Sequence, residues 1–260
     1  MMLCGSAANH VALANRLHAI HPLEHIAQIE PMKAKPRPLL YRAYSATVGF
    51  PLRNAWSAMV AQCSARYPTL PATTISRHPS VNSKSVVELV ERVRPDLVLV
   101  SGTDLLRQEI IDAIGRSAKI MNLHTGISPY IKGGPNCTNW ALALGEFDMI
   151  GNTVMWLDAG IDTGNIIATE RTPLTREETL TELHRKVMDH AHELYGRCYA
   201  LAVAGRPLPS VRQKEIAEGR LFYTKHWTTR EIRAAVVNFY KGYRTSKDMR
   251  TVRLVSPEAT

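Results

Sequence analysis

An unbroken apolar segment, Leu97-Val98-Leu99-Val100, constrains the fold of this 260-residue chain more than any other feature. A continuous run of branched apolar residues is typical of a parallel strand that is buried on both faces of its sheet. Before this segment, the apolar side chains of residues 84–93 recur at helical spacing, and after it residues 105–114 predict a second helix. A buried strand between two helices indicates an α/β fold.

The rest of the chain extends this pattern. Strands are predicted over residues 1–4, 23–29, 118–123, 150–157 and 165–170, and helices over residues 11–20, 40–67 (with a break near residue 50), 175–203 and 229–240. We expect Asn82-Ser83 and the pair Thr175 and Glu178 to cap two of these helices. The turn after the first strand contains one glycine, so the G-x-G-x-x-G dinucleotide fingerprint is absent and NAD is not expected.

The net charge is +9, and most of the excess lies near the C-terminus. Residues 205–260 contain 12 Lys or Arg against 5 Asp or Glu, a net of +7. A basic segment suits a polyanionic partner, such as nucleic acid, a phosphorylated ligand or an acidic membrane surface, and it suits a solvated basic face equally well. No apolar run approaches the ~20 residues of a membrane span. No secretory signal is visible and the four cysteines are scattered, so reduced thiols and a cytoplasmic protein are expected.

Residues able to do chemistry gather in the block from residue 121 to residue 167. Asn122 and His124 stand two residues apart at the carboxyl end of a predicted strand, so both side chains can project to one side. An amide beside an imidazole suits a tetrahedral oxyanion and a proton transfer near neutral pH. Asp162 lies in a glycine-flanked loop near the end of another strand, from which it can hold the protonation state of the imidazole. A structural role is the commoner one for each of these residues taken alone.

Taken in order, these residues resemble a known family. The pattern N-x-H-x-G-x-S-P, which begins at Asn122, is followed by D-x-G-x-D-T-G-x-I-I from Asp158, as in the folate-dependent formyltransferases that act on glycinamide ribonucleotide, methionyl-tRNA or amino sugars. The resemblance is strongest over residues 81–170. It implies a Rossmann-like parallel-sheet formyltransferase domain over residues 1–205 that uses 10-formyltetrahydrofolate. A small, mainly helical and basic extension over residues 206–260 would follow. The first strand is shorter than in the family pattern.

The same resemblance implies roles for individual residues. Asn122, His124 and Asp162 map onto the catalytic residues of the family. Asn122 would donate a hydrogen bond to the formyl oxygen, and Asp162 would stabilise the imidazolium form of His124. His124 would donate as well if it is cationic, and take the proton of the amine if it is neutral. The pterin ring is expected in a pocket lined by seven residues: Gly102, Thr103, Leu105, Leu106, Asp158, Gly160 and Ile161.

No nucleophile and no metal are expected. Formyl transfer to an amine needs no nucleophilic side chain, so Cys137 is expected to be a bystander. His190 and His192 are close in sequence but would lie about 200° apart around a helix, where they cannot share one ion.

Three features favour an amino sugar carried on GDP or dTDP as the acceptor of the formyl group. The first is the pair of segments G-I-S-P-Y at residues 126–130 and T-N-W at residues 138–140, which resembles the sugar enzymes. The second is the segment G-R-L-F-Y-T-K at residues 219–225, which resembles them as well. The third feature is a C-terminal region shorter than that of the tRNA enzymes. The candidates for binding the nucleotide-sugar are Lys132, Arg220, Tyr223 and Lys225, with Trp227 and Tyr240 as further stacking candidates and Phe239 in the core.

The expected setting is the synthesis of surface polysaccharide, such as the O-antigen of lipopolysaccharide. A homodimer is expected by family analogy, and nucleic acid is not expected as a partner. A methionyl-tRNA-type formyltransferase and an inactive folate-binding module are the alternatives. The first is favoured by the positive charge alone, and the second is disfavoured by the intact set of Asn122, His124 and Asp162.

Overall fold

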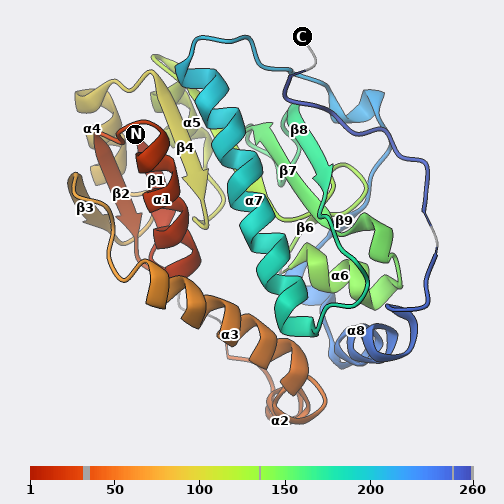
Figure 1. Cartoon of the computed structure of the whole chain (residues 1–260). Helices are drawn as coiled ribbons and strands as arrows, with labels where there is room; N and C mark the ends of the chain where they lie inside the picture. Colours follow the sequence, from red (N-terminus) through yellow and green to blue (C-terminus); the bar gives the residue numbers. More distant parts are fainter. Residues whose placement is uncertain (32–35, 135, 248, 259–260) are drawn as a thin grey trace.

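The computed structural model describes residues 1–31, 36–134, 136–247 and 249–258. Its centre is a seven-stranded sheet with the order β3-β2-β1-β4-β5-β7-β8 (Figure 1). The strands are β1 (Met2–Gly5), β2 (His25–Ile29), β3 (Thr74–His78), β4 (Leu97–Ser101), β5 (Lys119–His124), β7 (Gly151–Trp156) and β8 (Ile166–Arg171). Neighbouring strands run parallel from β3 to β5 in this order. Strand β7 pairs antiparallel with β5, and β8 pairs antiparallel with β7. The predicted Rossmann-like α/β class is therefore confirmed.

Helices cover both faces of the sheet (Figure 1). They are α1 (Ala8–Ile20), α2 (Leu39–Thr47), α3 (Phe50–Arg66), α4 (Lys84–Val93), α5 (Gln108–Gly115), α6 (Cys137–Leu144), α7 (Leu180–Val203) and α8 (Thr229–Gly242). On β4, Leu99 packs into the apolar cluster with residues of α1 and α7, whereas Val98 and Val100 pack into the cluster with α4 and α5. The apolar run of the sequence is continuous because both faces of this strand are buried.

The edge strand β3 was not predicted from the sequence. Its residues Thr74, Ile75 and Arg77 are exposed, so the segment has neither the alternation nor the continuous apolar run of a buried strand.

Two predicted helix starts were wrong, those of α5 and α7. Asn82 does not cap α4: its side chain donates to the Leu105 carbonyl at 2.9 Å and accepts from the Arg107 amide at 2.7 Å. These bonds hold residues 105–107 as a loop, so α5 begins at Gln108 rather than at residue 105. Ser83 occupies the cap position of α4 without a side-chain capping bond.

The second wrong start is that of α7, which begins at Leu180. The capping box is formed by Thr179 and Glu182, four residues beyond the expected pair. The Glu178 carboxylate does accept from the Thr175 amide at 2.8 Å, but it also binds Lys186 at 2.5 Å and the Tyr243 hydroxyl at 2.7 Å. A sequence pattern alone does not separate these two adjacent Thr-x-x-Glu boxes.

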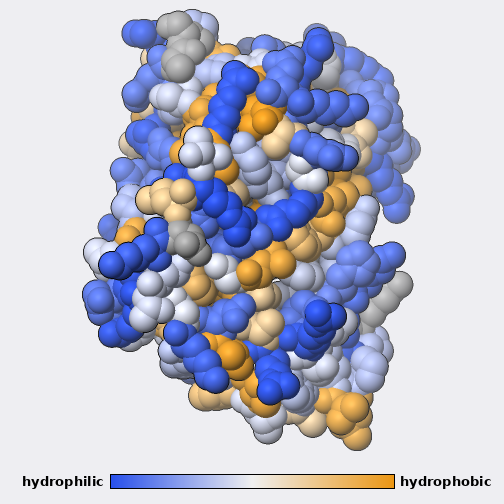
Figure 2. Space-filling view, turned by 90° about the vertical axis from the view of Figure 1, so that its right-hand side faces the viewer, coloured by the Kyte–Doolittle hydropathy of each residue, from blue (hydrophilic) through white to orange (hydrophobic). Residues whose placement is uncertain are grey.

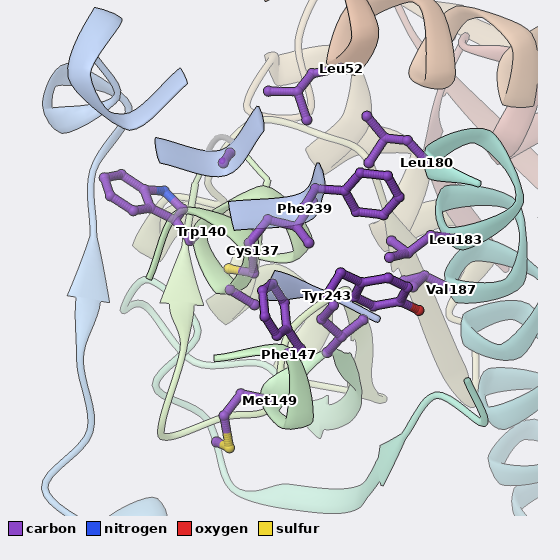
Figure 3. Close-up of a cluster of buried hydrophobic side chains, with 14 of the residues drawn as sticks. Leu52, Cys137, Trp140, Phe147, Met149, Leu180, Leu183, Val187, Phe239 and Tyr243 are labelled. Atoms are coloured by element: carbon purple, nitrogen blue, oxygen red, sulfur yellow. The ribbon is translucent and has the colours of Figure 1, made fainter. Parts of the chain in front are cut away.

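The C-terminal extension packs onto the domain that precedes it. Strand β9 (Leu221–Phe222) pairs in parallel with β6 (Lys132–Gly133), and Val211 forms a bridge with Ile166 of β8. Figure 3 shows Phe239 of α8, and Tyr243 directly after this helix, beside Phe147 and Leu183 in one buried apolar cluster. Phe239 is 8% exposed, which confirms its predicted place in the core. The domain boundary at residue 205 stays a prediction, and the two sides of it share this cluster.

Part of the basic charge of the extension is neutralised by the preceding domain. Glu146 pairs with Arg220 and, at 2.9 Å, with Arg250, while Glu177 pairs with Arg244 at 3.0 Å. The side of the molecule that carries α8 is nevertheless largely hydrophilic, with apolar patches between the charged side chains (Figure 2). Within the described residues, no helix has the length and apolar content needed to cross a membrane.

Candidate active site

A cavity of about 610 Å³ opens at the carboxyl ends of β1, β4 and β5. The helices after β1 and β4 leave toward opposite faces of the sheet, and such a divergence creates a crevice for ligands. Glycines keep the ends of the two strands close together. A Cβ on Gly5 would meet the Gly102 carbonyl at 2.4 Å, and a Cβ on Gly102, whose φ is +68°, would overlap the His10 ring.

His124 lies at the end of β5 with its ring enclosed. Its Nδ1 is 3.2 Å from Asp162 Oδ2 and its Nε2 is 3.3 Å from the Ile131 carbonyl. Burial of the ring disfavours the charged form, but the Asp162 carboxylate, with smaller effects from Cys137 and the Ile131 carbonyl, raises the pKa of His124 well above its usual range. Both ring nitrogens face acceptors, so the geometry suits an imidazolium that donates from each nitrogen.

Asp162 comes from the loop that connects β7 and β8, and its carboxylate makes a further contact besides that with His124. Oδ2 accepts from the Gly133 amide at 2.8 Å, so one oxygen is held between that amide and His124. The backbone at Asp162 has a φ of +50°, in the left-handed region that few non-glycine residues adopt. The side chain of Asp158 closes the loop from inside by accepting from the Gly160 amide at 3.0 Å and from Thr163 Oγ1 at 2.5 Å.

Asn122 lies two residues before His124 and also lines the cavity. Its side chain is half-buried, and within the described residues its carboxamide has no hydrogen-bond partner. A carboxamide in this state can donate to a ligand without first breaking a bond to the protein. The structure thus brings Asn122, His124 and Asp162 to one cavity from two segments about 40 residues apart in sequence, and their catalytic roles stay a prediction.

All seven residues predicted to surround a pterin line the same cavity: Gly102, Thr103, Leu105, Leu106, Asp158, Gly160 and Ile161. The loop after β4 supplies the first four, and the loop of Asp162 supplies the other three.

The four residues predicted to bind a nucleotide-sugar are placed differently from one another. Tyr223 lines the cavity, and Lys225 lies with its Nζ 5.5 Å from the centre of the Tyr223 ring. Lys132 and Arg220 lie outside the lining: Lys132 Nζ is 3.4 Å from Gln213 Oε1, and Arg220 is paired with Glu146. Trp227 is buried in the core and Tyr240 is exposed on α8, so neither contributes to the cavity.

Several cavity residues were not found from the sequence. These are Asn9 and His10 of α1, Trp56 of α3, and Met188 and His192 of α7, which form the helical wall of the cavity. Burial lowers the pKa of His10 to about 4 and, with Arg16 and His10 adding, that of His192 to about 3, so this wall is uncharged at neutral pH. These residues come from helices whose patterns are dominated by packing, which leaves no sequence signal for a site.

The charges around the cavity are mainly negative. Among the residues that the structure describes, the lining contains Asp104, Asp158 and Asp162 but no Lys or Arg. The same part of the chain holds no group of three or more His, Cys, Asp or Glu side chains arranged to bind a metal ion.

Comparison with known proteins gives two kinds of similarity. Residues 48–198 match the family model described as formyl transferase. The methionyl-tRNA formyltransferase of Finegoldia magna is 32% identical over 110 residues, which are 42% of this chain and 34% of the relative. The chain therefore spans about a third of the length of this relative.

Solved structures match over more of the chain. A sugar N-formyltransferase from a Shewanella species matches with a TM-score of 0.58 and 13% identity, over 92% of this chain and 86% of the other. An N-formyltransferase from Helicobacter canadensis, in complex with folinic acid and dTDP-3-aminofucose, matches with a TM-score of 0.55 and 14% identity, over 92% of this chain and 79% of the other. At these identities the similarity is one of fold.

Proposed function

The chain belongs to the formyl transferase family, and from this premise we propose that it transfers a formyl group from 10-formyltetrahydrofolate to the amine of a GDP- or dTDP-linked amino sugar. The observation that carries the proposal is the meeting of Asn122, His124 and Asp162 in one cavity between two loops suited to a pterin. The residues are proposed as the catalytic set, and the cavity as the place where folate and acceptor meet.

The chemistry needs charge stabilisation and two proton movements. The amine nitrogen bonds to the formyl carbon, the bond from that carbon to the folate N10 breaks, the amine loses a proton and N10 gains one. Negative charge develops on the formyl oxygen, and the free carboxamide of Asn122 is placed to donate to it. His124 adds positive charge next to this oxygen, because Asp162 keeps the ring in its cationic form. An oxygen that approaches Nε2 competes with the Ile131 carbonyl for its proton.

Reduced folate binding is the first expected result. Calorimetry with 5-formyltetrahydrofolate should show saturable binding, and Leu105→Glu should weaken it about 10-fold or more, since a leucine contact with an apolar ring is worth about 1.5–3 kcal/mol. Leu105 is 54% exposed, so its replacement leaves the fold intact. The matched control is Leu144→Glu, at a 41% exposed leucine of α6 that does not line the cavity. No binding of the folate at millimolar concentration, or equal weakening by both variants, would contradict the proposal.

The acceptor is proposed to enter from the side of Tyr223. The sugar and its amine would lie beside Asn122 inside the cavity, whose lining within the described residues contains no Lys or Arg for a diphosphate. Two cations of the described residues lie near this entrance and are not paired with a carboxylate there: Lys225, over the ring of Tyr223, and Arg37, whose Nη2 donates to the Thr224 carbonyl at 3.0 Å. We therefore propose that the diphosphate lies at the entrance, and that Lys225 and Arg37 bind it.

The acceptor assay separates the two leading activities. With a GDP- or dTDP-amino sugar, Lys225→Met should raise KM for the acceptor about 10-fold and leave KM for folate unchanged, while Lys241→Met on α8 changes neither. Rising salt concentration should weaken the binding of a diphosphate by two cations only moderately. Formylation of aminoacyl-tRNA, with a steep salt dependence and no turnover of any nucleotide-sugar, would replace this proposal by the tRNA activity.

The tRNA activity is the second candidate, because the relatives of about 30% identity are methionyl-tRNA formyltransferases. The nucleotide-sugar is favoured by the coverage of the structural matches, which include sugar N-formyltransferases over 92% of this chain. In the proposed setting the product is a formylated sugar for a surface polysaccharide.

A further inference from the structure

Gln213, in the short 3-10 helix of residues 213–215, is a buried polar side chain that the proposed reaction does not use directly. It is 6% exposed. Its Nε2 donates to the Asp162 carbonyl at 2.7 Å and to the Gly164 carbonyl at 2.8 Å. Its Oε1 is 3.4 Å from Lys132 Nζ. Two carbonyl acceptors on the same side identify that end of the amide as the nitrogen, and both of its protons are used.

These bonds act on the backbone immediately around Asp162. The carbonyls of residues 162 and 164 bracket one turn of the loop, in which Asp162 has a φ of +50°. A bridge between Val211 and Ile166, with backbone bonds of 2.8 and 3.0 Å, ties the segment of Gln213 to the strand that follows the loop. The segment that carries Gln213 is therefore anchored to β8, and the Gln213 side chain holds the loop from outside the cavity.

The same C-terminal segment also holds the other side of the Asp162 carboxylate. Gly133, whose amide donates to Asp162 Oδ2 at 2.8 Å, belongs to β6, and the Lys132 amide donates to the Arg220 carbonyl at 3.1 Å. The Gly134 amide likewise donates to the Phe222 carbonyl at 3.0 Å. Residues after 205 thus support Asp162 in two ways: Gln213 binds its backbone carbonyl, and β9 pairs with β6, the strand whose Gly133 amide binds the carboxylate.

We infer that Gln213 is a positioning residue, which keeps the Asp162 carboxylate against His124 by holding the loop carbonyls at residues 162 and 164. It does not touch the cavity, so it acts through Asp162 alone. The groups that face His124 are the Asp162 carboxylate, the Cys137 side chain and the Ile131 carbonyl, and the only cation on Gln213 within the described contacts is Lys132.

The test compares two carboxamides of the extension that make the same kind of contact. Asn238 donates from its Nδ2 to the carbonyls of Leu142 at 3.0 Å and Ala143 at 2.9 Å, at the end of α6. Gln213→Ala and Asn238→Ala each remove two such bonds, but only the first does so beside Asp162. Gln213→Glu keeps the shape and replaces the donor by a carboxylate, which repels the two carbonyls.

The primary readout is the titration of His124 by NMR in the protein without substrates, with His124→Asn used to assign its ring signals. In Gln213→Ala the pKa of His124 should fall by about one unit or more toward its usual value, because the carboxylate is less firmly held beside it. Gln213→Glu should change in the same direction, and Asn238→Ala should titrate like the wild type. An unchanged His124 titration in both Gln213 variants overturns the inference, as does an equal change in Asn238→Ala.

The kinetic readout rests on the proposed function, and the NMR readout does not. With formyl transfer as the assay, Gln213→Ala should lower kcat about 10-fold or more at nearly constant KM for folate, since the lost alignment affects the transition state. If the wild-type protein shows no formyl transfer activity, the proposed function is wrong, and the titration of His124 still tests the role of Gln213. An altered titration with unchanged kcat would overturn the positioning role in catalysis.

Discussion

Asp162→Asn should lower kcat at least about 100-fold, the size of effect seen when one group that stabilises charge in the transition state is removed. Asparagine keeps the shape, and its carbonyl oxygen can still accept from the Gly133 amide that now donates at 2.8 Å. It carries no negative charge, so His124 loses the carboxylate that lies 3.2 Å from its Nδ1 and with it the reason to stay cationic. His124→Asn should cost a similar factor.

Steady-state kinetics with saturating folate and acceptor measure this effect, and thermal unfolding checks the fold. The control is Asp112→Asn, at an exposed aspartate of α5 that pairs only with Gln108 among the described residues. Values of kcat within a few-fold of wild type for Asp162→Asn or His124→Asn would show that the cavity is not organised for formyl transfer as proposed.

The second large effect is a loss of stability in acid. Burial lowers the pKa of His10 and His184 to about 4 and that of His192 to about 3, because the charged ring is disfavoured away from water. The unfolded chain binds protons to these rings near pH 6.5, and the folded chain does not. Stability is therefore complete above about pH 6.5 and decreases as the pH falls below it, by on the order of 2 kcal/mol for each histidine between pH 7 and pH 5.

His124 contributes with the opposite sign. Its pKa is raised in the folded protein, so its contribution is present below about pH 6.5 and is lost as the pH rises through the folded value. Below neutral pH the histidines whose pKa is lowered by burial dominate, with His25 and His78 adding to the three above, since His124 is then protonated in both states.

Urea unfolding at pH 7.5 and pH 5.0 measures the acid effect. His184 is the best site for a test variant, because its ring is buried against the edge of Trp56 and does not line the cavity. His184→Leu should reduce the decrease between the two pH values by on the order of 2 kcal/mol. His21→Leu, at an exposed histidine, should leave the decrease unchanged. An equal free energy of unfolding of the wild type at both pH values would contradict the expected loss of stability in acid.

The parts of the fold that sequence analysis predicted are those in which local pattern and burial agree. Residues 97–100 of β4 are all apolar because both faces of this strand are covered, and α4 shows one apolar side because it has one covered face. Strand β3 lacks such a signal because it lies at the edge of the sheet and gains its order from pairing with β2. The start of α5 depends on Asn82, a residue 26 positions earlier, and no local pattern contains that contact.

The candidate site divides in the same way. Asn122, His124 and Asp162 were predictable because they stand in ordered segments at strand ends and in a loop with its own glycines. Gln213 was not, because a glutamine before two charged residues has no pattern, and its importance arises only where the chain returns to the loop. Charge was a poor guide for a related reason: Arg220 looked available for a phosphate, and in the fold it is engaged by Glu146.

The return of the chain to the Asp162 loop has a consequence for how the protein is made. Ribosomes deliver the sheet, His124 and the Asp162 loop first, and the residues that brace that loop, Gln213 and the β9 partner of β6, are delivered later. A still later pairing, between the Thr169 amide and the Val255 carbonyl at 2.8 Å, covers the strand that follows the loop. A nascent chain can therefore form its sheet before the segment that holds the Asp162 loop has been synthesised.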